Sequence, residues 1–142
     1  MFNITNLDLL SVAIATGAIF ILGFVIFFNN PKSVTNRSFL ILAISASIWS
    51  VFNYLSYQFQ SGKVVLWLLR GDIFFAVWFA FGFFLILFNF PDEKKIIPRW
   101  VKYFIFPLTI VSSVINLTPL VFTRVLEFTN GRVSSVENGY GI

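Results

Sequence analysis

The chain has 142 residues, of which 58% are hydrophobic and only 11% are charged, with a formal net charge of +4. An average soluble domain has about 25% charged residues, so this composition is typical of an integral membrane protein. Cys and His are both absent, which excludes disulfides, thiolate metal sites, cysteine nucleophiles and histidine bases from this sequence. It also has no phosphate-binding loop and no cluster of metal-ligand residues, and we expect no cofactor, no metal ion and no catalytic residue.

Four segments without a charged residue are each long enough to cross a bilayer, at 9–31, 38–62, 73–91 and 103–123. A helix rises about 1.5 Å per residue, so a hydrocarbon core of about 30 Å takes about 20 apolar residues. No basic segment precedes the first of them and no clear cleavage site follows it, so we interpret it as a retained helix. The sequence therefore predicts an all-α membrane region of four transmembrane helices over residues 1–120.

Helix-capping residues and prolines set the expected helix ends. Asn6 and Asp8 are candidate N-caps of the first helix, and Pro31 ends it because proline disfavours helix at the preceding residue. Pro98 lies where a first-turn proline starts the fourth helix. Pro107 predicts a kink within that helix, since it removes one backbone hydrogen bond and its ring clashes with the preceding turn. The helices are expected over residues 7–28, 36–59, 64–89 and 98–117.

Residues 121–142 differ in composition from the apolar segments. The stretch 121–128 is rich in β-branched and aromatic residues, and Asn130-Gly131 is the strongest short signal for a hairpin turn. We therefore predict a β-hairpin, which is barely stable alone and needs further strands or the membrane surface to pack on. The sequence stops at Ile142 in what we interpret as the middle of an element, so we expect a truncated segment of a longer protein.

Basic residues are distributed unequally between the connecting segments. The first and third loops carry six: Lys32, Arg37, Lys94, Lys95, Arg99 and Lys102. The second loop, the nearby start of the third helix and the tail carry four: Lys63, Arg70, Arg124 and Arg132. This bias favours cytoplasmic first and third loops, and hence an external N-terminus and external residues 121–142. No basic run is long enough to follow a phosphate backbone, so we expect a lipid partner and no nucleic acid.

Arg70 and Asp72 are the only charged residues near a predicted helix interior, and ionisable residues within the membrane are candidates for function. They are two positions apart and so point to different faces of the helix. A structural interpretation of Arg70 is snorkelling to lipid headgroups. Asp72 has a shorter side chain, for which we expect a partner on another helix. The functional hypothesis is that both residues take part in sensing a signal.

The second predicted helix has a polar face of small residues, which are Ala43, Ser45, Ala46, Ser47, Ser50, Asn53 and Ser56. Small residues four positions apart let helices approach closely, and the hydroxyl and amide groups can bond across the contact. Helix packing is therefore one interpretation of this face. A ligand pocket formed by Trp49, Asn53 and Tyr54 is the other. Trp49 and Trp78 lie at mid-span, away from the interfacial zones, so we expect them to face protein.

Three short sequences occur in a particular order along the chain. The first is Asn-Pro-Lys-Ser at 30–33 with Asn-Arg-Ser-Phe at 36–39, and the second is Trp-Leu-Leu-Arg at 67–70. The third is Leu-Thr-Pro-Leu-Val at 117–121, which leads into the β-rich segment with Gly131 and a final Gly139-Tyr140-Gly141. Together they resemble the N-terminal seven-helix membrane region that precedes some bacterial sensor histidine kinases, and the resemblance extends over nearly the whole chain.

The resemblance implies the first four helices and the external segment of a multi-pass sensor in the bacterial inner membrane. Three further helices and a cytoplasmic output domain would follow Ile142, and the partners would be lipid, the rest of the parent protein and, in a homodimer, a second copy. The residues at hand include no phospho-accepting histidine and no ATP site, so this chain would not itself be the kinase. The resemblance fixes no ligand and no catalytic residue.

A component of a membrane transporter or channel is the alternative class. It would need polar residues at mid-depth on several helices, discontinuous helices and usually an inverted internal repeat. Only the second helix has a polar stripe, and only Pro107 indicates a broken helix. A membrane-embedded enzyme is a third class, which the absence of His, Cys and paired mid-membrane carboxylates disfavours.

Overall fold

The computed structural model describes residues 4–59, 61–89, 97–129 and 132–139. Most of these residues are helical, which confirms the predicted all-α class, and the helix ends lie a few residues from the expected ones. A strand pair follows the last helix. The elements in chain order are α1 (Ile4–Asn29), α2 (Val34–Ser56), α3 (Gly62–Asn89), the π-helical segment η1 (Val101–Ile105), α4 (Phe106–Asn116), β1 (Phe122–Thr129) and β2 (Arg132–Asn138).

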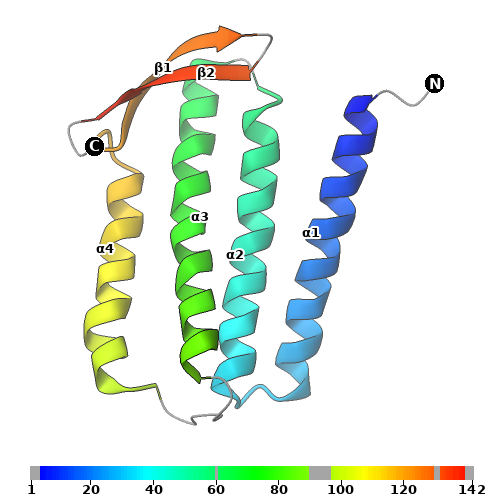
Figure 1. The fold of residues 1–142 in the computed structure, drawn as a ribbon, viewed down its shortest axis with the longest axis vertical. Coiled ribbons are helices and arrows are strands. Elements are labelled where there is room, and N and C mark those ends of the chain that lie inside the picture. The colour runs from blue at the N-terminus through cyan, green and yellow to red at the C-terminus, as the bar shows by residue number, and fades with distance from the viewer. Residues whose placement is uncertain (1–3, 60, 90–96, 130–131, 140–142) are drawn as a thin grey trace.

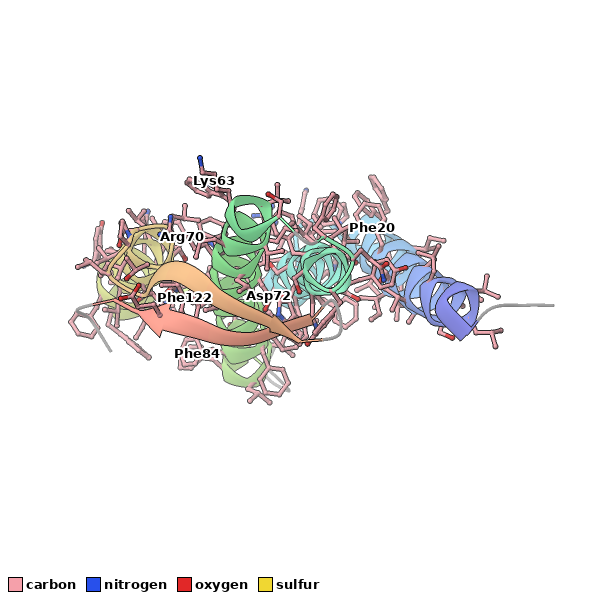
Figure 2. All side chains as sticks on the ribbon, turned by 90° about the horizontal axis from the view of Figure 1, so that it is seen from above. Phe20, Lys63, Arg70, Asp72, Phe84 and Phe122 are labelled. Carbon is pink, nitrogen blue, oxygen red and sulfur yellow. The ribbon has the colours of Figure 1, made fainter. Side chains whose placement is uncertain are left out.

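The helices lie side by side in a single layer, in the order in which they occur in the chain (Figure 1). The packed pairs are α1 with α2, α2 with α3, and α3 with α4. Figure 2, seen from above, shows the same row from α4 at one edge to α1 at the other. In the described part of the chain, therefore, the two edge helices each have a packed neighbour on one side only.

Among the described residues, three helices are long and apolar enough to cross a membrane, by length and composition: Leu9–Asn29, Val34–Ser56 and Gly62–Asn89. The fourth apolar helix, Val101–Asn116, is shorter than these and shorter than the expected span over 98–117. Large apolar side chains lie on the surface, with Ile21 64% and Phe28 69% exposed on α1 alone. Water would disfavour so much exposed apolar area, whereas a hydrocarbon environment would not.

The first two helices differ in how they begin. Ser33 caps α2, since its hydroxyl accepts a hydrogen bond from the backbone N–H of Asn36. The N-cap assignment of Asn6 and Asp8 is wrong, because α1 already begins at Ile4. A cap contributes only about 1 kcal/mol, and Ile4 to Asn6 include no residue that breaks a helix, so the helix extends past both candidates.

Pro107 is accommodated by a change of helix type. The backbone N–H of Phe106 donates to the carbonyl of Val101, five residues earlier, at the end of the π-helical turn η1. In a regular α-helix the ring of Pro107 would meet the carbonyl of Tyr103 and leave it without a donor. The wider π turn relieves this conflict, and α4 continues normally from Phe106.

Small residues set the spacing between the helices. A Cβ atom added to Gly23 would lie 2.5 Å from Cβ of Ala43, between α1 and α2. A Cβ atom added to Gly82 would lie 2.9 Å from the backbone nitrogen of Leu42, between α3 and α2. Any larger side chain at these positions would overlap the neighbouring helix. The close spacing of α1, α2 and α3 therefore requires glycine at both positions.

The polar face of α2 bonds across to α1. The hydroxyl of Thr16 donates to the hydroxyl of Ser50 at 3.1 Å, and the hydroxyl of Ser47 donates to the carbonyl of Thr16 at 3.4 Å. Ser56, by contrast, donates within its own helix to the carbonyl of Asn53. The packing interpretation of this face therefore holds for Ser47 and Ser50.

Strands β1 and β2 pair antiparallel over the segment for which the sequence predicts a hairpin, with Phe122 opposite Asn138 and Thr129 opposite Arg132. The expected turn, Asn130-Gly131, lies outside the described residues. The strand pair lies over the end of the layer at which α3 begins (Figure 1), and β1 contacts α3. Gly139 closes the pair by donating its N–H to the carbonyl of Val121 at 2.9 Å.

Candidate functional site

Arg70 lies in α3 near its N-terminal end, and its side chain is only 6% exposed. Its Nη2 donates a hydrogen bond of 2.6 Å to the backbone carbonyl of Phe122, the first residue of β1. Figure 2 labels both residues where β1 crosses the end of the helix layer. The guanidinium carbon is also 5.3 Å from the ring centroid of Trp67, within cation–π distance. Arg70 therefore joins the strand pair to α3.

The strand pair lies over the start of α3 and supplies a carbonyl acceptor for Arg70 within the protein, so the side chain is covered. The snorkelling interpretation stays a prediction, because this contact does not test an interaction with lipid headgroups. The Nε atom is buried and has no hydrogen-bond partner in the described part of the chain. A buried donor without an acceptor is unfavourable, and this Nε–H can therefore donate a hydrogen bond to a polar ligand or to a further segment of protein.

Asp72 has a partner on another helix, as the sequence predicts. The side chain of Trp49 on α2 forms a hydrogen bond with the carboxyl group of Asp72. The ring centroids of Trp49 and Phe79 are 6.1 Å apart. The other carboxyl oxygen, Oδ1, is buried and has no partner among the described residues. Figure 2 shows Arg70 and Asp72 on different sides of α3, so they form two separate polar contacts.

The structure does not join Asn53 and Tyr54 to either contact. Both residues are half-buried on α2, and the hydrogen bonds described for them involve their backbone carbonyls, which accept from Ser56 and Tyr57. Of the three residues of the predicted ligand pocket, Trp49 is thus the one with a defined polar role.

A cavity of about 380 Å³ lies at this end of the layer instead, beside the Trp67 ring that covers Arg70. Its lining residues are Phe52, Lys63, Val64, Trp67 and Leu68. Four of these residues share one face of α3 through their spacing of one and four positions. Only the fold shows that Phe52 of α2 lies beside them.

Two further polar groups are buried without a partner in the described residues. Trp78 has an unbonded Nε1, while its ring packs edge-on against Phe81 and Phe106 at about 6 Å, so it faces protein as expected. Asn89 donates from Nδ2 to the carbonyl of Leu85, whereas its Oδ1 has no partner. Trp78 lies about two turns beyond Arg70 on α3 and Asn89 is the last residue of that helix. The contacts described for them involve other residues than those around Arg70.

The two separate contacts at Arg70 and Asp72 offer polar groups that could bind a ligand or a protein segment. They supply a buried guanidinium N–H, a buried carboxyl oxygen and the face of Trp67. No group of three or more His, Cys, Asp or Glu residues that could hold a metal ion occurs among residues 4–59, 61–89, 97–129 and 132–139.

Comparison of the chain with models of protein families, with curated proteins and with solved structures gives no match. Its function must therefore be argued from its own residues and their arrangement.

Proposed function

We propose that this chain is the sensory input region of a bacterial signalling protein and that its output domain, a histidine kinase, lies outside these residues. In this proposal α1 to α4 cross the bacterial inner membrane, and the N-terminus and the strand pair are external. The observation that carries the proposal is the hydrogen bond from Arg70 to Phe122. It connects the strand pair, where an external signal would arrive, to a helix that runs the full depth of the layer.

The bond between Arg70 and Phe122 is strong enough to act as a signalling contact. A hydrogen bond to a charged group contributes about 1.5–3 kcal/mol, and about 1.4 kcal/mol changes an equilibrium constant tenfold. A signal that moves β1 would withdraw the acceptor from a buried guanidinium and so change the relative stability of two positions of α3. The 28 residues of α3 extend roughly 40 Å, so a shift of the helix would reach the opposite face of the membrane.

The open layer supports the same proposal. Helices α1 and α4 form its two edges (Figure 1), and large apolar side chains remain exposed on both, such as Phe28 and Leu108. Further helices of the parent protein, or a second copy in a homodimer, would pack there beside lipid.

The proposal is tested by replacing Arg70 in the full-length protein and measuring kinase output with and without the stimulus. Arg70→Ala removes the bond to Phe122 and should change basal output at least fivefold, and Arg70→Lys, which keeps the charge without the planar fork, should give an intermediate effect. Lys32→Ala is the control, since Lys32 is an exposed cation in the connection between α1 and α2, away from the candidate site. Normal output from correctly inserted Arg70→Ala protein would refute the signalling role of this contact.

A transporter or channel component is the alternative proposal. The observation that favours it is the π-helical turn before Pro107, because irregular helices often line substrate sites in transporters. Against it, the buried hydroxyls of Thr109 and Ser113 on α4 donate to carbonyls of their own helix, so they offer no polar path. Flux of ions or solutes into proteoliposomes containing the full-length protein would establish this alternative.

A further inference from the structure

A second cavity lies at the opposite end of the layer from the strand pair. It has a volume of about 480 Å³ and lies between the start of α2, the end of α3 and the start of the fourth helix. Its walls are apolar, with Phe81 and Val101 buried and Phe106 40% exposed. A cavity of this size and lining can hold part of an acyl chain.

Two cations, Arg37 and Lys102, line the same cavity, and no acidic residue is among its described lining residues. Both side chains are exposed at its mouth. Arg37 is held in place by a hydrogen bond of 2.6 Å from its Nε to the carbonyl of Pro31, which uses one of the five N–H donors of the guanidinium. The ammonium group of Lys102 lies 5.9 Å from the ring centroid of Tyr103.

We infer that this cavity binds an anionic phospholipid, with the phosphate between Arg37 and Lys102 and an acyl chain against Phe81 and Phe106. The assignment rests on the combination of two cations with an apolar wall. A free phosphate ion would contact only the cations, and a lipid without net charge would gain little from them, whereas an anionic phospholipid would contact both. Basic pockets between helices on the cytoplasmic side commonly bind anionic headgroups. The inference does not depend on the sensory proposal, because the cavity lies at the far end of α3 from Arg70.

The test is equilibrium binding of fluorescently labelled phosphatidylglycerol to the purified full-length protein in detergent. Each cation near an anionic surface contributes about 1 kcal/mol, or roughly fivefold in affinity. We therefore expect Lys102→Gln to weaken binding about fivefold and the double variant Arg37→Gln/Lys102→Gln about 30-fold. The matched control is Lys32→Gln/Arg99→Gln, which removes two exposed cations from the same end outside the cavity and should change the affinity less than twofold.

Competition identifies what the site prefers. Unlabelled phosphatidylglycerol should displace the probe, and phosphatidylcholine and inorganic phosphate should do so at least tenfold less well. Equal competition by phosphatidylcholine, or by inorganic phosphate, would overturn the inference, as would equal losses in the cavity and control variants. Lys102→Gln keeps the Arg37 to Pro31 bond, so an unchanged affinity in this variant would count against the site even if the double variant folds poorly.

Discussion

Asp72 shows how a single half-buried carboxyl group connects two helices of the layer. The side chain of Trp49 on α2 forms a hydrogen bond with the Asp72 carboxyl group. The Oδ1 atom of that group is buried and has no partner in the described residues. Polar contacts between membrane helices are commonly worth about 0.6–2 kcal/mol. The contact thus contributes to the position of α2 against α3, on the opposite side of α3 from the Arg70 bond.

We predict that Trp49→Phe lowers the stability of the protein by about 1 kcal/mol, because it removes the donor and leaves the Asp72 carboxyl group without a partner. Thermal unfolding in detergent micelles would measure the change. In the background of Asp72→Asn, which is uncharged, the same Trp49→Phe substitution should cost less. Equal costs in both backgrounds would show that the two side chains do not interact.

At the scale of elements, helix spacing depends on where glycine lies. We predict that Gly82→Ala destabilises the protein by about 1–3 kcal/mol, since the added Cβ would overlap the backbone of Leu42 and force α2 and α3 apart. The measurement is again thermal unfolding in micelles.

Gly17→Ala provides the control for this prediction. A Cβ atom at Gly17 meets no other atom within 4 Å, and alanine favours helix over glycine by up to about 1 kcal/mol. The Gly17→Ala variant should be as stable as the parent or slightly more stable. If both variants lose stability equally, close approach at Gly82 is not the cause.

The helices were predictable from sequence because apolar runs between charges and prolines leave few alternatives. The partner of Arg70 was not predictable, since a backbone carbonyl carries no residue-specific signal and Phe122 is separated from Arg70 by 52 positions. For Asp72 the sequence predicted a partner on another helix but could not name Trp49. Pro107 predicts an irregular helix from sequence alone. The sequence does not show that the irregularity takes the form of a π turn over Val101–Ile105.

At the scale of the whole molecule, the two ends of the layer differ in charge, and this predicts orientation. The end with Lys32, Arg37, Arg99 and Lys102 should be cytoplasmic. In the cysteine-free chain, Ser61→Cys should react with an impermeant thiol reagent added to intact cells, and Lys32→Cys should react only after permeabilisation. Both residues are exposed, at opposite ends of the layer. The reverse labelling pattern would show that the chain has the inverted orientation.

The single-layer arrangement also bears on the order of assembly during synthesis. Each helix packs on the one made just before it. If the helices enter a membrane as proposed, they can therefore dock one at a time without waiting for distant parts of the chain. The bond between Arg70 and Phe122 is the exception, because its acceptor is made 52 residues after its donor. Until β1 has reached the same side of the membrane, the guanidinium must remain hydrated or bound elsewhere. Closure of the strand pair over α3 thus marks the completion of this part of the protein.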